Sequence, residues 1–140
     1  MIELIYLASQ IQCGANSPLI NVQVEVYQNQ ELIQTMHLED KVLLPVNSVQ
    51  ELNFKYKFLN ATCSPATPTE MVLGSEDPVP NVPGVYDQQS IQQMLDGLND
   101  YEELFLVELG TTNKKSSAFD LQDVVLLVNN NPQVNSLVAD

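Results

Sequence analysis

Hydrophobic residues along this chain follow two patterns, and each pattern predicts a different kind of strand. Two runs, 104–107 and 124–128, are apolar at every position. A strand with one wet face alternates apolar and polar residues, so uninterrupted runs predict strands that are covered on both faces. Their β-branched and aromatic residues, bounded by Gly, Ser and Asn, favour strand over buried helix. We therefore expect these runs to be the two central strands of a sheet, joined by the polar loop 110–117.

Alternation of apolar and polar residues predicts half-exposed strands in the first half of the chain. Val22, Val24 and Val26 share one face of such a strand, with polar residues between them. Residues 28–31 are expected to form a hairpin turn, and Pro45 places the strand that contains it at a sheet edge. The other predicted strands span residues 2–11, 32–38, 41–46, 51–59 and 71–73, and alternation is clear again in 51–59.

One amphipathic helix is predicted over residues 88–96. Its apolar side chains recur at i, i+3, i+4 and i+7, which makes a single stripe. The members of the stripe are Ile91, Met94, Leu95 and Leu98. Asp87 is expected to cap the helix, and Gly97 to end it in the left-handed conformation. Because the two-sided strands need a cover, we expect the helix to pack on the outer face of their sheet.

These elements predict a mainly β fold: an antiparallel β-sandwich of about seven short strands with one helix on the sheet. An α+β sheet with one open face is the alternative. We expect residues 1–131 to form one domain and residues 132–140 a tail that frays or adds an edge strand. Segment 60–86 holds five of the eight prolines, so most of it is expected to be a functional or mobile excursion.

The charge of the chain limits the classes of partner. Five Lys and no Arg face 18 acidic residues, which gives a net charge of -13. This field repels phosphate backbones and anionic lipid, and guanidinium groups for bidentate phosphate recognition are missing. Residues 70–140 carry 12 acids and two Lys, whereas residues 1–69 carry six acids and three Lys. We therefore expect no nucleic acid or membrane partner. Any function of the negative charge is expected to lie mostly in the second half of the chain.

The apolar start of the chain and its two cysteines bear on location. Met1 to Leu7 lacks a basic segment and contains Glu3, which argues against a signal sequence, and no run approaches the length of a membrane span. We therefore predict a soluble, cytoplasmic protein. In a reducing cytosol Cys13 and Cys63 are expected to be two free thiols, although a disulfide is sterically possible if their strands are neighbours.

His37 is the chain's sole imidazole, and it limits the catalytic and metal chemistry. It lies in the predicted strand 32–38, where a surface histidine is the expected reading. One histidine cannot make a multi-histidine zinc site, and with Cys13 and Cys63 it forms no recognisable zinc spacing. We therefore predict a protein without catalytic residues and without zinc.

Acidic residues near the loop between the two apolar runs are the candidate metal ligands. If the runs pair antiparallel, Glu108 at the end of the first becomes the neighbour of Asp120, with Asp123 close by. Oxygen ligands of this kind suit Ca²⁺, so Glu108, Asp120 and Asp123 are the predicted metal residues, with Ca²⁺ as the possible cofactor. The other acidic groups, 76–77 and 96–103, are expected at the opposite strand end or in the proline segment.

Two short stretches carry local resemblances. Val24 to Leu32 resembles the strand, turn and strand of many carbohydrate-binding β-sandwiches. Asp120 to Val125 is similar to an acidic strand-entry motif of some bacterial calcium-associated sandwiches, but Gln122 stands where that motif usually has Asn. The stretches are generic and do not identify a family.

Three function classes follow from these observations. The first is a non-catalytic protein-interaction or assembly module, expected to be a homodimer because the two-sided strands exceed what one helix covers. The second is a Ca²⁺-dependent module that binds a glycan or surface polymer through the acids at Asp120 and Asp123. The third is a carboxylate hydrolase, which needs two close acids in a concave site.

Overall fold

The two apolar runs form neighbouring, fully buried strands at the centre of the fold, as the sequence predicts. The computed structural model describes residues 1–14, 16–78, 88–113 and 120–132. In chain order the strands are β1 (Ile2–Ala8), β2 (Val22–Gln28), β3 (Glu31–Met36), β4 (Lys41–Leu44), β5 (Asn53–Phe58), β6 (Thr69–Gly74), β7 (Glu102–Glu108) and β8 (Val124–Asn129). The helix α1 spans Gln88–Asp96, and a single 3₁₀ turn, η1, spans Val49–Glu51.

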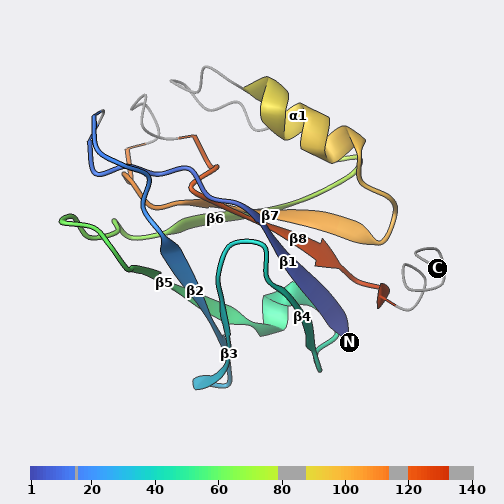
Figure 1. The fold of residues 1–140 in the computed structure, drawn as a ribbon. Coiled ribbons are helices and arrows are strands. Elements are labelled where there is room, and N and C mark those ends of the chain that lie inside the picture. The colour runs from blue at the N-terminus through green and yellow to red at the C-terminus, as the bar shows by residue number, and fades with distance from the viewer. Residues whose placement is uncertain (15, 79–87, 114–119, 133–140) are drawn as a thin grey trace.

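The strands make two antiparallel sheets that face each other (Figure 1). The larger has the order β4-β1-β8-β7-β6, and the smaller has the order β3-β2-β5. β7 and β8 pair in register from Glu102 opposite Asn129 to Val107 opposite Val124, and both lie inside the larger sheet. This arrangement confirms the predicted antiparallel β-sandwich with one helix.

Side chains from both sheets form the core between them. On β1, Ile2, Leu4 and Tyr6 point inward and are almost completely buried, and the valines of β2 do the same from the opposite sheet. The Phe54 and Phe105 rings meet across the interface with centroids 4.7 Å apart. One apolar layer therefore joins strands from both ends of the described chain.

The outer side of the larger sheet is covered by α1 (Figure 1). Ile91 and Leu95 of the helix are 2% and 1% exposed. They belong to a cluster that also contains Leu73, Leu104, Leu106, Leu121 and Val125. The predicted packing of the helix on the sheet is confirmed. None of the described helices has the length and apolarity needed to cross a bilayer.

The predicted ends of the helix need one correction. Gly97 does not adopt the left-handed conformation, so that part of the prediction is wrong. The helix instead tightens, because the N–H groups of Gly97 and Leu98 donate to carbonyls three residues earlier. The proposed cap, Asp87, lies outside the described residues.

Local turn chemistry accounts for the smaller sheet and the edges. Asn29 and Gln30 both have positive φ, as the tight turn between β2 and β3 requires. β4 lies at the edge of the larger sheet, as Pro45 predicts. The sequence reading missed η1, although Ser48 and Glu51 form the S-x-x-E capping box that starts it.

Cys13 and Cys63 form a disulfide, so the expectation of two free thiols is wrong. Their Cα atoms are 5.7 Å apart, within the range that a disulfide requires. The sandwich brings together the loop after β1 and the loop after β5, which are 50 residues apart in the chain. Closing a loop of this length restricts the unfolded chain and contributes roughly 4 kcal/mol in the loop-entropy model.

Several expected features fall partly outside the described residues. In the proline-rich segment 60–86, β6 is confirmed and extends beyond the predicted 71–73, while residues 79–86 are not described. Residues 133–140 of the predicted tail also lie outside, so its fraying or pairing stays a prediction.

The packing of α1 gives a first testable prediction. Leu95→Ala is expected to lower the free energy of unfolding by about 2 to 4 kcal/mol, because it leaves a cavity between helix and sheet. Gln93→Ala, on the exposed side of the same helix, should change it by less than about 0.5 kcal/mol. Urea unfolding of both variants measures the difference, and equal values would contradict the described packing.

Candidate functional site

The three predicted metal residues lie together at one end of the β7–β8 pair. Glu108 ends β7, Asp123 directly precedes β8, and Asp120 lies three residues earlier. One carboxylate oxygen from each falls within 4.8 Å of the others. Glu108 is fully buried and Asp123 is 3% exposed, whereas Asp120 is half-buried. We call this group the acidic cluster. The antiparallel register brings the residues together as the sequence indicates.

The acidic cluster holds the two ends of the β7–β8 loop together through backbone N–H groups. The N–H groups of Asp120 and Leu121 donate to Glu108 Oε1 at 2.7 and 3.3 Å. In the other direction, the N–H groups of Leu109 and Gly110 donate to Asp123 Oδ2 at 2.7 and 3.1 Å. Each loop end therefore supplies a carboxylate to the other.

Two backbone features depend on these hydrogen bonds between the loop ends. Leu121 is fully buried and has a φ of 60°, a left-handed conformation that is uncommon for a residue with a side chain. The hydrogen bond from its N–H to Glu108 and its contact with the helix-side core hold it there. A Cβ on Gly110 would lie 3.1 Å from Glu108 Oε2, so a glycine allows the carboxylate to approach.

Burial and mutual repulsion change the proton affinity of the acidic cluster. Burial, together with a hydrogen bond to Glu108, raises the pKa of Asp123 to about 9, and backbone N–H donation from Leu109 offsets part of the increase. Burial also raises the pKa of Asp120, against donation from the Gln122 N–H. A pKa of about 9 keeps the Asp123 carboxyl protonated at neutral pH.

Asp120 and Asp123 open onto a surface cavity of about 350 Å³. Its other walls come from Gln10, Ile11, Gln12, Cys13, Gly14 and Gly110. Carboxylate, amide and backbone oxygens at one cavity suit a hard cation such as Ca²⁺. Two close acids at a cavity also meet the first requirement for acid–base hydrolysis. None of the described residues that line it is aromatic, although sugar sites usually have an aromatic side chain.

Five other acidic residues of the second half of the chain gather at a different place. Glu76, Asp77, Asp100, Glu102 and Glu103 surround a hollow of about 620 Å³ at the other end of β7. This hollow and the acidic cluster are separated by the length of the strand, so the two groups do not meet, as predicted.

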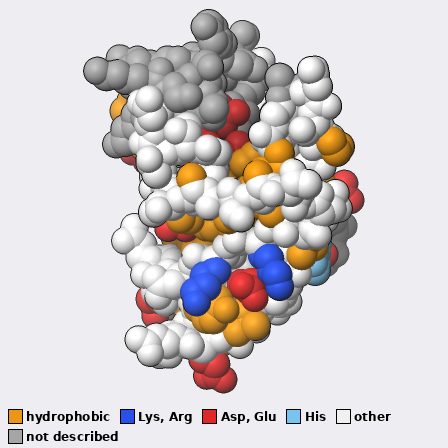
Figure 2. All heavy atoms as spheres, turned by 90° about the vertical axis from the view of Figure 1, so that its left-hand side faces the viewer, with side chains coloured by type: hydrophobic (Ala, Val, Ile, Leu, Met, Phe, Trp, Pro, Cys, Tyr) orange, Lys and Arg blue, Asp and Glu red, His pale blue; other side chains and the backbone are white. Residues whose placement is uncertain are grey.

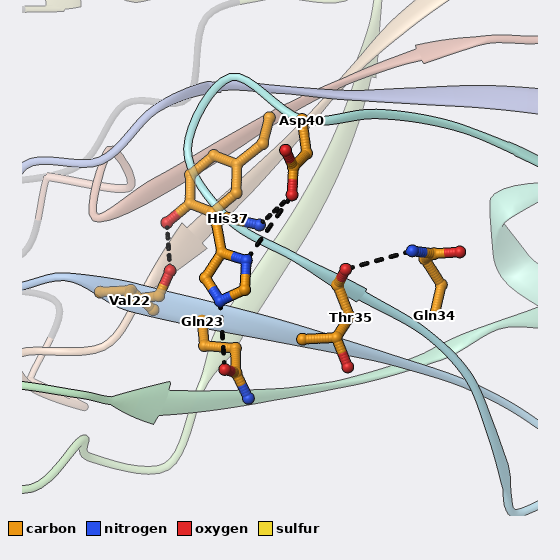
Figure 3. A network of polar contacts seen from close by, with 7 residues as sticks. Val22, Gln23, Gln34, Thr35, His37 and Asp40 are labelled. Atoms are coloured by element: carbon orange, nitrogen blue, oxygen red, sulfur yellow. Dashed lines mark hydrogen bonds and ion pairs between the residues drawn. The ribbon is translucent and has the colours of Figure 1, made fainter.

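His37 lies just after β3 and is exposed, in agreement with the surface reading (Figure 3). Its Nε2 is 3.2 Å from Gln23 Oε1, and its Nδ1 is 3.7 Å from Asp40 Oδ2. The His37 backbone N–H also donates to Asp40 Oδ2 at 2.8 Å. Both ring nitrogens therefore face polar side chains, and neither hydrogen-bonds a hydroxyl or thiol among the described residues.

A second cavity, of about 330 Å³, lies where the sandwich opens near His37. We call it the end cavity. It is lined by Tyr6, Ser9, Leu19, Ile20, Asn21, Val22, His37, Leu38 and Leu59. In its wall the Tyr6 hydroxyl donates to the Val22 carbonyl at 2.9 Å. Burial raises the pKa of this phenol, so it remains a donor.

The end cavity was not predicted from the sequence, because its walls come from four separate segments of the chain. Each contributes an apolar residue beside a turn, and Leu19, Leu38 and Leu59 are about half exposed. A leucine in a polar loop is the one signal that could have been noted. Comparisons with protein-family models, curated proteins and solved structures give no match to this chain.

The raised pKa of Asp123 gives a prediction about stability. Because the folded state holds this proton more tightly than the unfolded chain, its contribution is complete below about pH 4 and is lost as pH rises towards about 9. Asp123→Asn keeps the acceptor for Leu109 and cannot lose a proton. We expect the free energy of unfolding to fall less steeply with pH in this variant than in the wild type.

Urea unfolding at several pH values between these limits measures the two slopes. Asp96→Asn makes the same change on the exposed end of α1 and should leave the wild-type slope in place. Equal slopes in the wild type and Asp123→Asn would show that the cluster does not hold the proton.

Proposed function

We propose that this protein is a non-catalytic interaction and assembly module that forms a homodimer. The proposed contact surface is the β1–β4 face, defined by Glu3, Ile5, Leu7, Lys41 and Leu43 on the outer side of the larger sheet. The observation that carries the proposal is that α1 covers only the other half of this side (Figure 1).

The register of β1 and β4 identifies the outward side chains. Ile2 pairs with Leu44 in the core, so the next pair along, Glu3 and Leu43, points outward. Leu43 is 56% exposed, and Leu7, further along β1, is 42% exposed. The buried cluster beneath α1 has members from β6, β7 and β8, and among the described residues of β1 and β4 only Ala8, at the end of β1, packs against it. Apolar surface therefore remains on this half of the sheet.

Charge supports a second copy as the partner. Two copies of a chain with a net charge of -13 repel each other unless the surface in contact is apolar or locally neutral. On the β1–β4 face Glu3 pairs with Leu43, and Ile5 pairs with Lys41, so the face carries one acid and one base. A twofold axis through it can place Lys41 of one copy opposite Glu3 of the other.

The surroundings of His37 bear on the non-catalytic role, and the disulfide bears on the location of the protein. His37 contacts Gln23 and Asp40, which supports a non-catalytic role. A disulfide persists in oxidising compartments and is rare in the cytosol. The Cys13–Cys63 bridge therefore supports an oxidising location over the cytoplasmic one expected from the sequence.

Sedimentation tests the homodimer directly. The wild type should sediment as a dimer at micromolar concentration, and Leu43→Asp should shift it to monomer because it places charge in the apolar contact. Leu32→Asp is the matched control, since Leu32 is 46% exposed on an edge strand of the smaller sheet. A wild type that is monomeric at micromolar concentration, or equal effects of the two variants, would contradict the proposed face.

The second candidate function is Ca²⁺-dependent binding of a glycan or surface polymer at the acidic cluster. The close approach of the three carboxylates beside an open cavity favours it. Binding of the cation would have to displace the Asp123 proton, so affinity should rise with pH.

A thermal melt tests this candidate. Millimolar Ca²⁺ should raise the melting temperature, and more so at about pH 8 than at about pH 6, since a ligand of the folded state stabilises it. Asp120→Asn should remove the shift, whereas Glu76→Gln in the other acidic hollow should retain it. A melting temperature that Ca²⁺ does not move would eliminate the candidate.

A further inference from the structure

Three exposed leucines converge on the end cavity from different parts of the chain. Leu19 precedes β2, Leu38 lies between β3 and β4, and Leu59 follows β5. They are 58%, 51% and 47% exposed. A single exposed leucine is ordinary, but three that border one cavity form an apolar mouth.

The interior of the end cavity is also mainly apolar, with few polar groups. Ile20 and Val22 are buried in its wall, and Asn21 and His37 lie at its solvent side. The Ser9 hydroxyl is buried and lies near the Tyr6 phenol. An apolar pocket with a few convergent polar groups is the usual form of a small-molecule site. Its 330 Å³ fits a short aliphatic chain.

A basic side chain lies beside the mouth. The register places Lys57 opposite Gln23, whose amide oxygen contacts His37, so Lys57, Gln23 and His37 form one row across the exposed face of the smaller sheet. The next row towards the cavity contains Asn21 and Leu59. Figure 3 shows Asp40 on the opposite side of the imidazole from Gln23. A head group above Gln23 can therefore approach Lys57 and His37 together.

The two lysine side chains of β5 have different neighbours. Figure 2 shows two basic side chains with an acidic one between them, above hydrophobic side chains. Lys55 lies over the Tyr27 ring at 4.7 Å and stands opposite Glu25 in the strand register, whereas Lys57 stands opposite the neutral Gln23. Neither lysine makes an ion pair within the described residues. Lys57 is thus the cation available to an anionic head group at the mouth.

We propose that the end cavity binds a medium-chain alkyl carboxylate. The aliphatic chain lies among Leu19, Leu38 and Leu59, and the carboxylate lies at the mouth beside Lys57 and His37. The apolar lining supplies most of the affinity, and the lysine selects the sign of the head group. Glu39 and Asp40, in the same loop as Leu38, are the groups that would favour the opposite sign, so a cationic amphiphile is an essential comparison.

Titration of the isotope-labelled full chain, followed by NMR, tests the site. Octanoate should shift the backbone amides of Asn21, Leu38 and Leu59. Affinity should rise about fourfold for each methylene from hexanoate upward and level off when the cavity is full. Octylammonium should bind more weakly than octanoate. Equal binding of both, or the absence of any dependence on chain length, would overturn the proposal.

Matched variants separate the two parts of the site. Lys57→Gln should weaken octanoate about two- to fivefold and leave octanol unchanged, as expected for loss of one exposed ion pair. Lys55→Gln should change neither. Leu38→Asp should weaken both ligands about tenfold, whereas Leu32→Asp on β3 should not. Equal effects of the two lysine changes, or of the two leucine changes, would place binding elsewhere, and a melt of each variant confirms that it folds.

Discussion

Removal of water from both faces of the β7–β8 pair is the constraint on which the rest of this structure depends. Leu104, Leu106 and Val125 point to the helix, while Phe105, Val107 and Leu126 point to the smaller sheet. Burying each such side chain contributes about 1.5 to 3 kcal/mol, so leaving either face wet would remove much of the stability. The smaller sheet covers one face and α1 the other. The disulfide then ties the two sheets together at their open end.

The same burial creates the unusual chemistry at the end of the pair. Glu108 continues the buried strand, and Asp123 faces it from the start of β8, so both carboxyls are held where ions are poorly solvated. Backbone N–H groups that donate to both carboxyls, and the proton that Asp123 retains, compensate for the lost water. The hydrogen bond from the Leu121 N–H to Glu108 holds Leu121 in a left-handed conformation beneath the helix. Local charge and global packing are therefore linked at this loop.

The outer side of the larger sheet is covered unevenly, and the proposed dimer contact lies on its uncovered part. One helix of nine residues spans β6, β7 and β8 and leaves the outer side of β1 and β4 with exposed leucines. At one end of the sandwich, segments from both sheets line the end cavity. The β1–β4 face and the end cavity have one cause, which is that the described elements leave some apolar side chains of the sandwich uncovered. Self-association and ligand binding at these places are compatible, since Tyr6 points inward and Leu43 outward.

Local patterns in the sequence determined most elements, because periodicity reports which faces a segment must bury. The period-two valines of β2, the stripe of α1 and the continuous runs of β7 and β8 each gave the correct element. The approach of Glu108 to Asp120 was also predictable, because hairpin register is nearly local. Only the tertiary structure placed β1 between β4 and β8, joined Cys13 to Cys63, and gathered Leu19, Leu38 and Leu59 at one cavity. These contacts join segments that are distant in the chain, and they arise when the whole core closes, which no short stretch of residues encodes.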